Sequence, residues 1–541
     1  MNSGESITDM KEFNTTGVCI PSKHYMVDIS ERVCEIKKLV DSGKYFTINR
    51  ARQYGKTTTL KALEKAISEE YYVVSMDFQA YGNDTFEDSD SFSRDFASVF
   101  CTKLSKAAHD DDKLKEVIKH LSDMAAADSK KIRLFSLFNG LREIWETSSK
   151  PVVLFIDEVD SASDNQIFLD FLAQLRLQYL EREKDDDYKT FHSVVLAGVT
   201  DVRYLRYKIR PEDEHKVNSL WNIAADFNID MSLSEIGIKG MLDEYENDHH
   251  TGMDSKRIAK LIREYTNGYP FLVSRICQLI DTQVSRILGS ETAWSGRGID
   301  EAIKLILSED NTLFQSLSAK LKNYPELRES LYSILINGAR IPWSPDQDDI
   351  AQMQMYGFIR NEKNTVRIDN RIFETRLYNL FLSDEEMRSN VFAKRGDLAK
   401  NQFVKDGRLD MGLILQRFGE TYTEIFGPLT DRFKEKDGRE LFLLYLRPII
   451  NGTGNYYIEA QTRDQTRTDV IVDYLGEQYI IELKIWRGER YNADGEKQIC
   501  EYLDYFGLST GYMLSFNFNK KKETGLVKVD IEDKVLFECT V

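Results

Sequence analysis

The sequence predicts an α/β protein built from several domains, and three observations lead to that class. Near-continuous apolar segments alternate with amphipathic helices over residues 44–201, as in a parallel sheet that is covered on both faces. Residues 234–319 have a helical pattern, broken once at Gly and Pro residues near position 268. The last third contains strand-like segments around a short turn, with charged residues at alternate positions.

The length and composition are those of a folded globular protein. At 541 residues, the chain is too long for a single hydrophobic core. Hydrophobic residues at 42% and charged residues at 30% exclude a disordered chain. We expect a cytoplasmic protein, because neither a secretory leader nor an apolar membrane span is recognisable. The cysteines are far apart and lack zinc-ligand spacing, which is typical of thiols in a reducing compartment: Cys19, Cys34, Cys101, Cys277, Cys500 and Cys539.

The net charge of −17 is distributed unevenly along the chain. Residues 391–541 carry 22 basic and 25 acidic side chains, a net of −3, so most of the negative charge precedes them. Binding to nucleic-acid phosphates needs a local excess of Lys and Arg. Any nucleic-acid contact is therefore expected in the C-terminal part.

The order of elements predicts four domains in series. The expected strands of the first sheet are residues 44–49, 71–78, 152–157 and 192–199. Two helices, near 327–336 and 348–355, precede two short strands within 357–369, which is the pattern of a winged helix. We therefore expect a parallel-sheet core over 1–233, a helical lid over 234–320, a winged-helix-like unit over 321–385 and a second α/β domain over 391–541, after a charged linker at 383–390.

A phosphate-binding loop is expected where the first strand ends. The segment RARQYGKT, residues 50–57, connects that strand to a helix over 57–67. Exposed N–H groups of the first helical turn bind phosphate, Gly55 allows close approach, Lys56 reaches the β and γ oxygens, and Thr57 ligates Mg²⁺. GKT also occurs in ordinary turns, but the flanking strand and helix favour the phosphate loop. The expected nucleotide contacts come from Arg50, Arg52, Gly55, Lys56, Thr57 and Thr58.

A second motif follows the expected strand 152–157, which ends in two carboxylates. In a phosphate-loop enzyme, Asp157 orients Mg²⁺ and Glu158 polarises the attacking water. Strands often end in acids, but two motifs in the right order favour the catalytic interpretation. Thr200, after the last strand, is either a sensor of the γ-phosphate or part of a plain turn. Surface salt bridges are favoured over an arginine finger for three residues that follow: Arg203, Arg206 and Arg210.

Four segments of the chain resemble the predicted AAA-ATPase family of bacteria, which carries a nuclease-like tail and falls within the STAND class of ATPase switches. They are YMVD at 25–28, RARQYGKT, LFIDEVD and NGYPF. The family loop is R-P-R-R-x-G-K-[ST], so Arg50 matches it, whereas Ala51 and Gln53 depart from it. The resemblance covers residues 10–382 and implies an ATP-binding switch. Pro270, in the family's Gly-x-Pro motif, implies a lid helix that touches the nucleotide.

We expect a β-hairpin at residues 467–485, with candidate catalytic side chains on one of its two faces. If Leu475 and Gly476 form a two-residue turn, Asp469 lies directly opposite Glu482. Alternation then puts Asp469, Asp473, Glu482 and Lys484 on one face and apolar residues on the other. Two facing carboxylates repel each other unless a cation binds them. Lys484 beside them can orient or deprotonate a water.

This arrangement resembles the PD-(D/E)xK nucleases, whose domain is a restriction-endonuclease-like α/β fold. The resemblance implies that Asp469 and Glu482 bind the metal and that Lys484 is the third catalytic residue. It also implies a helical metal ligand at Glu440 and an accessory Gln-x-x-x-Tyr element: Gln498 and Tyr502. Thr468 replaces the family's proline. A solvated charged face is the alternative, and Glu459 is either a further ligand or a surface acid.

The sequence therefore predicts an ATP-hydrolysing switch that requires Mg²⁺ and controls a nuclease using Mg²⁺ or Mn²⁺. We expect a nucleic-acid substrate, no membrane partner, and a role in defence or in mobile elements by analogy of architecture. A protein or phage-derived trigger and a homo-oligomer are compatible with this class. The alternatives are a signalling or scaffold ATPase whose nuclease-like domain binds a partner, and a winged-helix DNA-binding switch.

Overall fold

The protein is described by a computed structural model. Within it, residues 435–437, 455, 457–461 and 467–469 are described by their backbone only. The described residues are 10–127, 131–163, 165–199, 221–335, 339–383, 390–426, 435–450, 454–461, 467–486, 496–497, 499–500, 503–504, 507–517, 519 and 524–541.

The chain divides into two compact units. The first contains Met1–Leu233 together with Met355–Gly357, and the second contains Ser234–Gln354 and Phe358–Val541. Each unit has its own secondary structure and core, and each is described by itself. Among the described residues, no helix is both long and apolar enough to cross a membrane.

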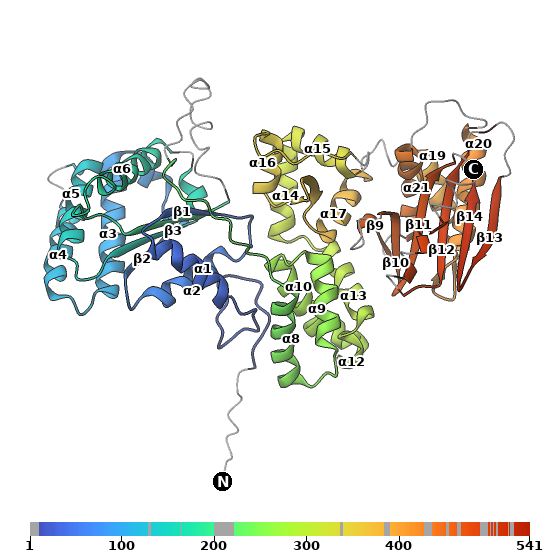
Figure 1. The fold of residues 1–541 in the computed structure, drawn as a ribbon, viewed down its shortest axis with the longest axis horizontal. Helices are drawn as coiled ribbons and strands as arrows, with labels where there is room; N and C mark the ends of the chain where they lie inside the picture. The colour runs from blue at the N-terminus through green and yellow to red at the C-terminus, as the bar shows by residue number, and fades with distance from the viewer. Residues whose placement is uncertain are drawn as a thin grey trace, which may run out of the picture. The chain divides into compact units, whose positions relative to one another are not determined.

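The first unit is built around a four-stranded parallel sheet in the order β1-β4-β3-β2 (Figure 1). Nearly every residue of these strands is buried, as expected for strands covered on both faces. The four predicted strands are confirmed, each within one residue of its expected ends: β1 at Tyr45–Asn49, β2 at Tyr72–Asp77, β3 at Val152–Asp157 and β4 at Ser193–Gly198.

Helices cover both faces of this sheet. One face packs against α1 (Ser30–Asp41) and α2 (Lys56–Ile67). The other packs against four helices, three of which are inserted between β2 and β3: α3 (Ser89–Ala107), α4 (Asp112–Ala126), α5 (Leu134–Thr147) and α6 (Gln166–Arg182).

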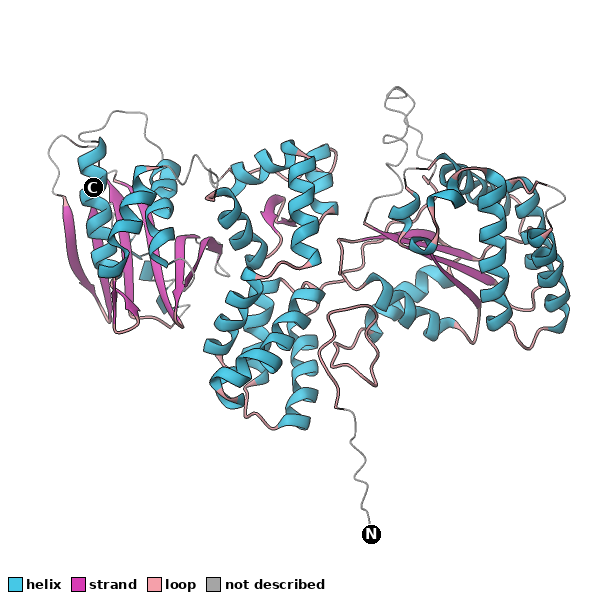
Figure 2. Ribbon diagram, turned by 180° about the vertical axis from the view of Figure 1, so that it is seen from behind, coloured by secondary structure: helices cyan, strands magenta, loops and turns pink. Residues whose placement is uncertain are grey.

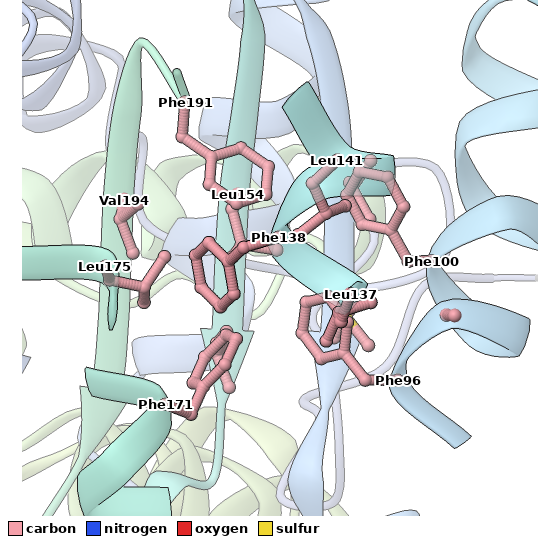
Figure 3. Packing of buried hydrophobic residues seen from close by; sticks show 14 of the residues in the cluster. Phe96, Phe100, Leu137, Phe138, Leu141, Leu154, Phe171, Leu175, Phe191 and Val194 are labelled. Carbon is pink, nitrogen blue, oxygen red and sulfur yellow. The ribbon is translucent and has the colours of Figure 1, made fainter. Parts of the chain in front are cut away.

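The core on the α3–α6 side is rich in aromatic rings (Figure 3). Phe171 lies at its centre, with ring centroids 5.0 Å from Phe96 and 5.8 Å from Phe138. Each buried aromatic side chain contributes a large apolar area, and offset or edge contacts add to it. This core holds the carboxyl ends of the strands, and hence the candidate site, in place.

The second unit begins with a helical region. The Pro at the start of α10 and the left-handed residues before it separate two of its helices, as the sequence predicts. Its main helices are α8 (Glu235–His249), α9 (Ser255–Thr266), α10 (Pro270–Leu279), α13 (Gly296–Ser308) and α14 (Thr312–Asn323), with short helices α11 (Ser285–Leu288) and α12 (Ser290–Ala293) and a π-helix at Ile280–Val284 between α10 and α13.

Two helices and a small antiparallel hairpin follow, in the order that the sequence predicts for a winged helix. They are α15 (Pro325–Leu335), α16 (Asp348–Met355), β5 (Ile359–Glu362) and β6 (Thr365–Ile368), and α17 (Arg371–Phe381) completes this part.

The C-terminal part is a six-stranded mixed sheet in the order β13-β14-β12-β11-β10-β9, covered on one face by helices (Figure 2). Its strands are β9 (Gly454–Gln461), β10 (Arg467–Tyr474), β11 (Glu477–Ile485), β12 (Thr510–Phe516), β13 (Gly525–Ile531) and β14 (Lys534–Thr540). The helices before them are α19 (Val391–Ala399), α20 (Met411–Phe426) and α21 (Glu435–Ile450), with a small hairpin, β7 (Val404–Lys405) and β8 (Arg408–Leu409), between α19 and α20.

Helix α21 lies very close to this sheet. A Cβ atom at Gly438 would meet the ring of Phe516 at 2.4 Å, so only glycine allows this approach. The ring of Phe418, on α20, also lies 5.3 Å from Phe442 and 6.5 Å from Phe516. These contacts place α20 and α21 on the face of the sheet that carries Phe516.

Candidate functional site

The loop between β1 and α2 has the conformation of a phosphate-binding loop. Gln53 and Gly55 both have positive φ, 57° and 80°, which turns the backbone sharply before α2 begins at Lys56. The first turn of α2 therefore presents backbone N–H groups that have no partner within the helix. These groups and the helix dipole form a site for anionic oxygens.

Lys56 lies within this loop, and its side chain is buried. Its ammonium donates to the carbonyl oxygens of Arg50 at 3.0 Å and Ala51 at 3.1 Å. Burial lowers the pKa of Lys56, while the nearby carboxylate of Glu158 acts in the opposite direction. A buried cation held only by carbonyl oxygens is well suited to exchange them for phosphate oxygens, which carry full charge.

Thr57 and Asp157 come from different elements and lie in direct contact. The hydroxyl of Thr57 donates to the Asp157 carboxylate at 2.6 Å, which joins the start of α2 to the end of β3. Hydroxyl and carboxylate oxygens are ligands that Mg²⁺ prefers. The sequence predicts these two residues as the Mg²⁺ ligands, and the structure brings them together.

Glu158 follows β3 in a left-handed conformation, with φ of 52°. A non-glycine residue there is strained by about 1–2 kcal/mol, a cost that surrounding structure must offset. Burial raises the pKa of Glu158, and the charge of Lys56 partly offsets that rise. A carboxylate with a raised pKa is a stronger base, as activation of a water requires.

The other predicted loop contacts have structural partners. The guanidinium of Arg50 donates to the carbonyls of Asn49 and Ile229, both at 2.8 Å, and lies over the ring of Phe227. Thr58 accepts a hydrogen bond from the backbone N–H of Cys19 at 3.2 Å. Arg52 is exposed. Arg50 and Thr58 thus also anchor the loop, a role that the sequence analysis missed because Ile229 and Cys19 are distant from the loop in the chain.

The predicted lid motif, Gly268-Tyr269-Pro270, lies in the second unit. Asn267 and Gly268 have positive φ, Tyr269 is fully buried against the ring of Phe373, and Pro270 is the first residue of α10. Proline at the first helical position costs no hydrogen bond. Contact of Pro270 with nucleotide stays a prediction. Outside the described residues lie Thr200, Arg203, Arg206 and Arg210.

The β10–β11 hairpin has the predicted register. Leu475 and Gly476 both have positive φ, as a two-residue type I′ turn requires, and Val470 pairs with Ile481. Extending that register by one pair puts the backbone of Asp469 opposite Glu482. The Asp469 side chain is outside the described residues, so the separation of the two carboxylates stays a prediction.

Glu482 and Lys484 lie on the same face of β11. Their side chains form an ion pair at 2.8 Å, with 1% of the Glu482 side chain and 16% of the Lys484 side chain exposed. Asp473 is also buried. For Glu482 and Asp473, the alternative of a solvated charged face is therefore excluded. Other parts of the domain cover this face, so its charges must be neutralised within the protein.

The sequence predicts one apolar face and one face of charged residues. The face that carries Glu482, however, also contains apolar side chains. Ile471 and Ile480, which share its alternation with Asp473 and Glu482, are fully buried. The Glu482 face is also packed, because Tyr265 of α9 contacts Asp473, and a Cβ at Gly511 on the same face would meet Ile499 and Leu503 at 3.0 Å. Alternation alone cannot distinguish a buried polar position from an exposed one.

Helix α21, which carries Glu440, covers the face of the sheet on which Phe516 lies. Glu482 lies on the other face of the sheet. The same pairing puts Ser515 and Glu538 on the face of Lys484. Ser515 donates to the buried Glu538 at 3.2 Å. The sequence analysis missed Glu538, although its alternation with apolar neighbours in β14 is a usable signal.

The remaining predicted nuclease residues are not tested. Gln498 and Tyr502 are outside the described residues, and so is the side chain of Glu459. Among the side chains that are described, no cluster of three or more His, Cys, Asp or Glu is arranged to hold a metal ion. The side chain of Asp469 is not among them, so the metal ligands Asp469, Glu482 and Glu440 remain a prediction.

Comparison with solved structures gives low-identity matches that cover about two thirds of the chain. The Walker-type ATPase of Pyrococcus abyssi shares 13% identity, with a TM-score of 0.44, and the match covers 68% of this chain and 99% of that one. Cdc6p of Pyrobaculum aerophilum shares 12%, with a TM-score of 0.34, over 70% and 98%. The RuvB Holliday junction branch migration motor of Thermotoga maritima shares 11%, with a TM-score of 0.30, over 66% and 96%.

Comparison with families is decisive for residues 15–383, which match the family described as AAA-like domain. The sequence matches none of the curated proteins. The matched range contains both the phosphate-binding loop and the Asp157–Glu158 pair, whose contacts are those of a nucleotide site. Since the family covers more than half of the chain, this protein belongs to the AAA-like domain family of P-loop ATPases.

Proposed function

We propose that this ATPase is a nucleotide-dependent switch that controls a metal-dependent nuclease in its C-terminal domain. One observation carries the nuclease half of the proposal. Glu482 and Lys484 form an ion pair on one face of β11, and the register of the hairpin puts the backbone of Asp469 opposite Glu482. Two facing carboxylates can hold a divalent cation for hydrolysis of a phosphodiester, and a lysine beside them can orient the attacking water.

In the ATPase half, each residue has a defined task. The N–H groups of the first turn of α2 and the ammonium of Lys56 bind phosphate oxygens. Thr57 and Asp157 would hold Mg²⁺, which neutralises charge on the phosphates when it is bound. Their hydroxyl and carboxylate, 2.6 Å apart, are suitable donors for this ion. Glu158, with its raised pKa, takes a proton from the attacking water.

In the C-terminal half, Asp469 and Glu482 would hold Mg²⁺ or Mn²⁺, which activates water and stabilises charge on the phosphate when it is bound. The donor set fits: the carboxylate of Glu482 is buried and has one oxygen on Lys484, and a cation would add to the neutralisation of its charge. Lys484 orients the water or moves its proton. The substrate is nucleic acid, and a protein or phage-derived trigger and a homo-oligomer belong to the same proposal.

A second candidate is a scaffold ATPase whose C-terminal domain binds a partner without cleavage. The nearly complete burial of Glu482 favours it, because an ion pair with Lys484 already supplies one countercharge. In that case the pair would stabilise the domain and the face would not accept a phosphodiester. The winged-helix DNA-binding switch has no comparable observation in its favour.

A cleavage assay with the full chain separates the two candidates. Linear and circular DNA and RNA, single and double stranded, are incubated with Mg²⁺ or Mn²⁺, with and without ATP. We expect cleavage by the wild type, altered by ATP, and none by Asp469→Ala or Lys484→Ala. Glu477→Gln, a half-exposed acid of the same hairpin that pairs with Arg408, is the matched control and should cleave normally. Cleavage that survives Asp469→Ala would reject the nuclease site.

A further inference from the structure

A buried polar cluster joins the helical region to the C-terminal hairpin and belongs to neither proposed catalytic site. The hydroxyl of Tyr265, on α9, donates to the Asp473 carboxylate of β10 at 2.8 Å and lies 3.4 Å from the Asp300 carboxyl of α13. Tyr265 and Asp473 are 4% and 5% exposed. All three residues lie in the second unit, and the chain separates Tyr265 from Asp473 by 208 positions.

The tip of the hairpin rests on the same helix. A Cβ atom at Gly476 would lie 3.9 Å from the side chain of Arg297 and 4.0 Å from the carboxyl of Asp300. This is ordinary contact distance, so the β10–β11 turn packs directly on α13. Asp469 and Glu482, the proposed metal ligands, are on the two strands that this turn connects.

One hydroxyl proton cannot satisfy two carboxylates. When Tyr265 donates to Asp473, its oxygen is left as an acceptor, and a protonated Asp300 can donate to it. If both carboxyls are ionised, they repel each other in surroundings of low polarity. Burial, followed by the charge of Asp473, raises the pKa of Asp300 to about 7.

Other charged groups surround the cluster. On α13, Lys304 favours the ionised form of Asp300 and Glu301 opposes it. Arg297 of α13 lies beside Gly476, and the guanidinium of Arg371, on α17, lies over the ring of Tyr265 at 5.8 Å. Since Lys304 pairs with Glu301 at 2.9 Å, its effect on Asp300 is partly neutralised.

Tyr265 is also close in sequence to the predicted nucleotide-sensing turn. It precedes Thr266, whose hydroxyl accepts from the N–H of Gly268 at 3.0 Å, and Pro270 begins the next helix. A change in this turn would therefore move the end of α9 and, with it, the Tyr265 hydroxyl. Without that hydroxyl, the two carboxyls lose the group between them.

We propose that Tyr265, Asp300 and Asp473 form a latch that docks the β10–β11 hairpin on the helical region when Asp300 is protonated and releases it when both carboxyls are ionised. The latch would transmit nucleotide binding at the lid to the proposed nuclease strands, and this regulatory part rests on the proposed function. Docking of the hairpin is thus controlled by protonation of the carboxyls and by the position of α9.

The sign of the pH effect follows from the raised pKa of Asp300. The docked state binds more protons than the undocked one, so docking is strongest below an ordinary Asp pKa of about 4 and weakens as pH rises to about 7. Between pH 6 and pH 8, the docking constant should fall by about ten-fold. Above pH 8, no further change is expected from this group.

Hydrogen–deuterium exchange of the full chain, followed by mass spectrometry without nucleotide or metal, tests the latch. After correction for the intrinsic exchange rate, peptides over residues 470–481 should lose about ten-fold in protection between pH 6 and pH 8. Asp300→Asn, a neutral isostere, should be protected at both values, and Tyr265→Phe should be less protected than the wild type at pH 6.

Glu301→Gln is the matched control, because it removes an acid from the next position of α13 and leaves the three latch residues in place. It should retain a pH-dependent loss of protection, shifted to lower pH because Glu301 favours the protonated form of Asp300 and pairs with Lys304. A wild type without pH-dependent protection, or an Asp300→Asn variant that keeps the full dependence, would overturn the proposal. Thermal melts of each variant verify that the C-terminal domain is folded in all of them.

A second arm tests the coupling. Adding ATP and Mg²⁺ at pH 6 should reduce hairpin protection in the wild type but not in Lys56→Ala. If the pH response is present and the ATP response is absent, the latch stands and the regulatory link fails. If ATP does not bind at all, the proposed nucleotide switch fails, independently of the pH result.

Discussion

Lys56 is buried and Glu158 is half-buried, and their different pKa shifts suit different tasks in ATP hydrolysis. Lys56→Ala should abolish measurable ATP binding, a loss of at least about two orders of magnitude, because several charge-assisted hydrogen bonds of about 1.5–3 kcal/mol each disappear. Isothermal titration with a non-hydrolysable analogue measures this. Lys61→Ala, an exposed position on the same helix, is the control. Unchanged affinity in Lys56→Ala would remove this site.

Glu158 is expected to act as the base for hydrolysis. Glu158→Gln should bind ATP normally and hydrolyse it about 10²–10⁴ times more slowly. Because burial raises the pKa of Glu158, the rate of the wild type should fall as pH decreases through a value above the ordinary Glu pKa of about 4.3. The pH profile of kcat checks this. An acid limb that persists in Glu158→Gln would assign it to another group.

At the scale of single elements, the packing of α21 against the sheet depends on one glycine. Gly438→Ala should destabilise the C-terminal domain by about 1–3 kcal/mol, because the new Cβ meets the Phe516 ring at 2.4 Å. Gly240→Ala in α8, where nothing lies within 4 Å, is the matched control and should be neutral or stabilising by up to about 1 kcal/mol. Thermal denaturation measures both. Equal effects would contradict the close approach.

The β10–β11 hairpin should respond to metal through its paired acids. Without added metal, Asp469→Ala should be at least as stable as the wild type, because it removes one of two facing carboxylates. With Mg²⁺ or Mn²⁺ at about 100 times Kd, the wild type should gain about 2.7 kcal/mol and the variant little. Thermal melts of the two proteins measure the difference. Equal metal-induced shifts would favour the scaffold candidate.

At the scale of the whole molecule, the two activities should be separable. Asp469→Ala should lose cleavage and retain ATP hydrolysis, because its site and the Lys56–Glu158 site belong to different units. Lys56→Ala should retain the metal-dependent stabilisation of the hairpin and lose the effect of ATP on cleavage. Parallel ATPase and nuclease assays on the same preparations check this. Loss of ATP hydrolysis in a folded Asp469→Ala protein would contradict independent sites.

Local patterns were sufficient to predict much of this fold. The strands of the first sheet are recognisable because a strand covered on both faces must be apolar almost throughout, as β3 is. The hairpin register was predictable because Gly476 favours a tight turn between the two strands, and a two-residue turn sets the pairing of both strands. Thr57 and Asp157 were predictable as a pair because the phosphate-loop chemistry requires both.

The sequence by itself determined the elements and motifs, since each depends on residues near one another in the chain. Only the tertiary structure decided what surrounds them. Glu482 is buried on the face predicted to carry catalytic residues, Arg50 reaches Ile229, and Tyr265 meets Asp473 across 208 positions. These contacts arise from packing between distant segments, and neither hydrophobic periodicity nor motif spacing encodes which segments meet.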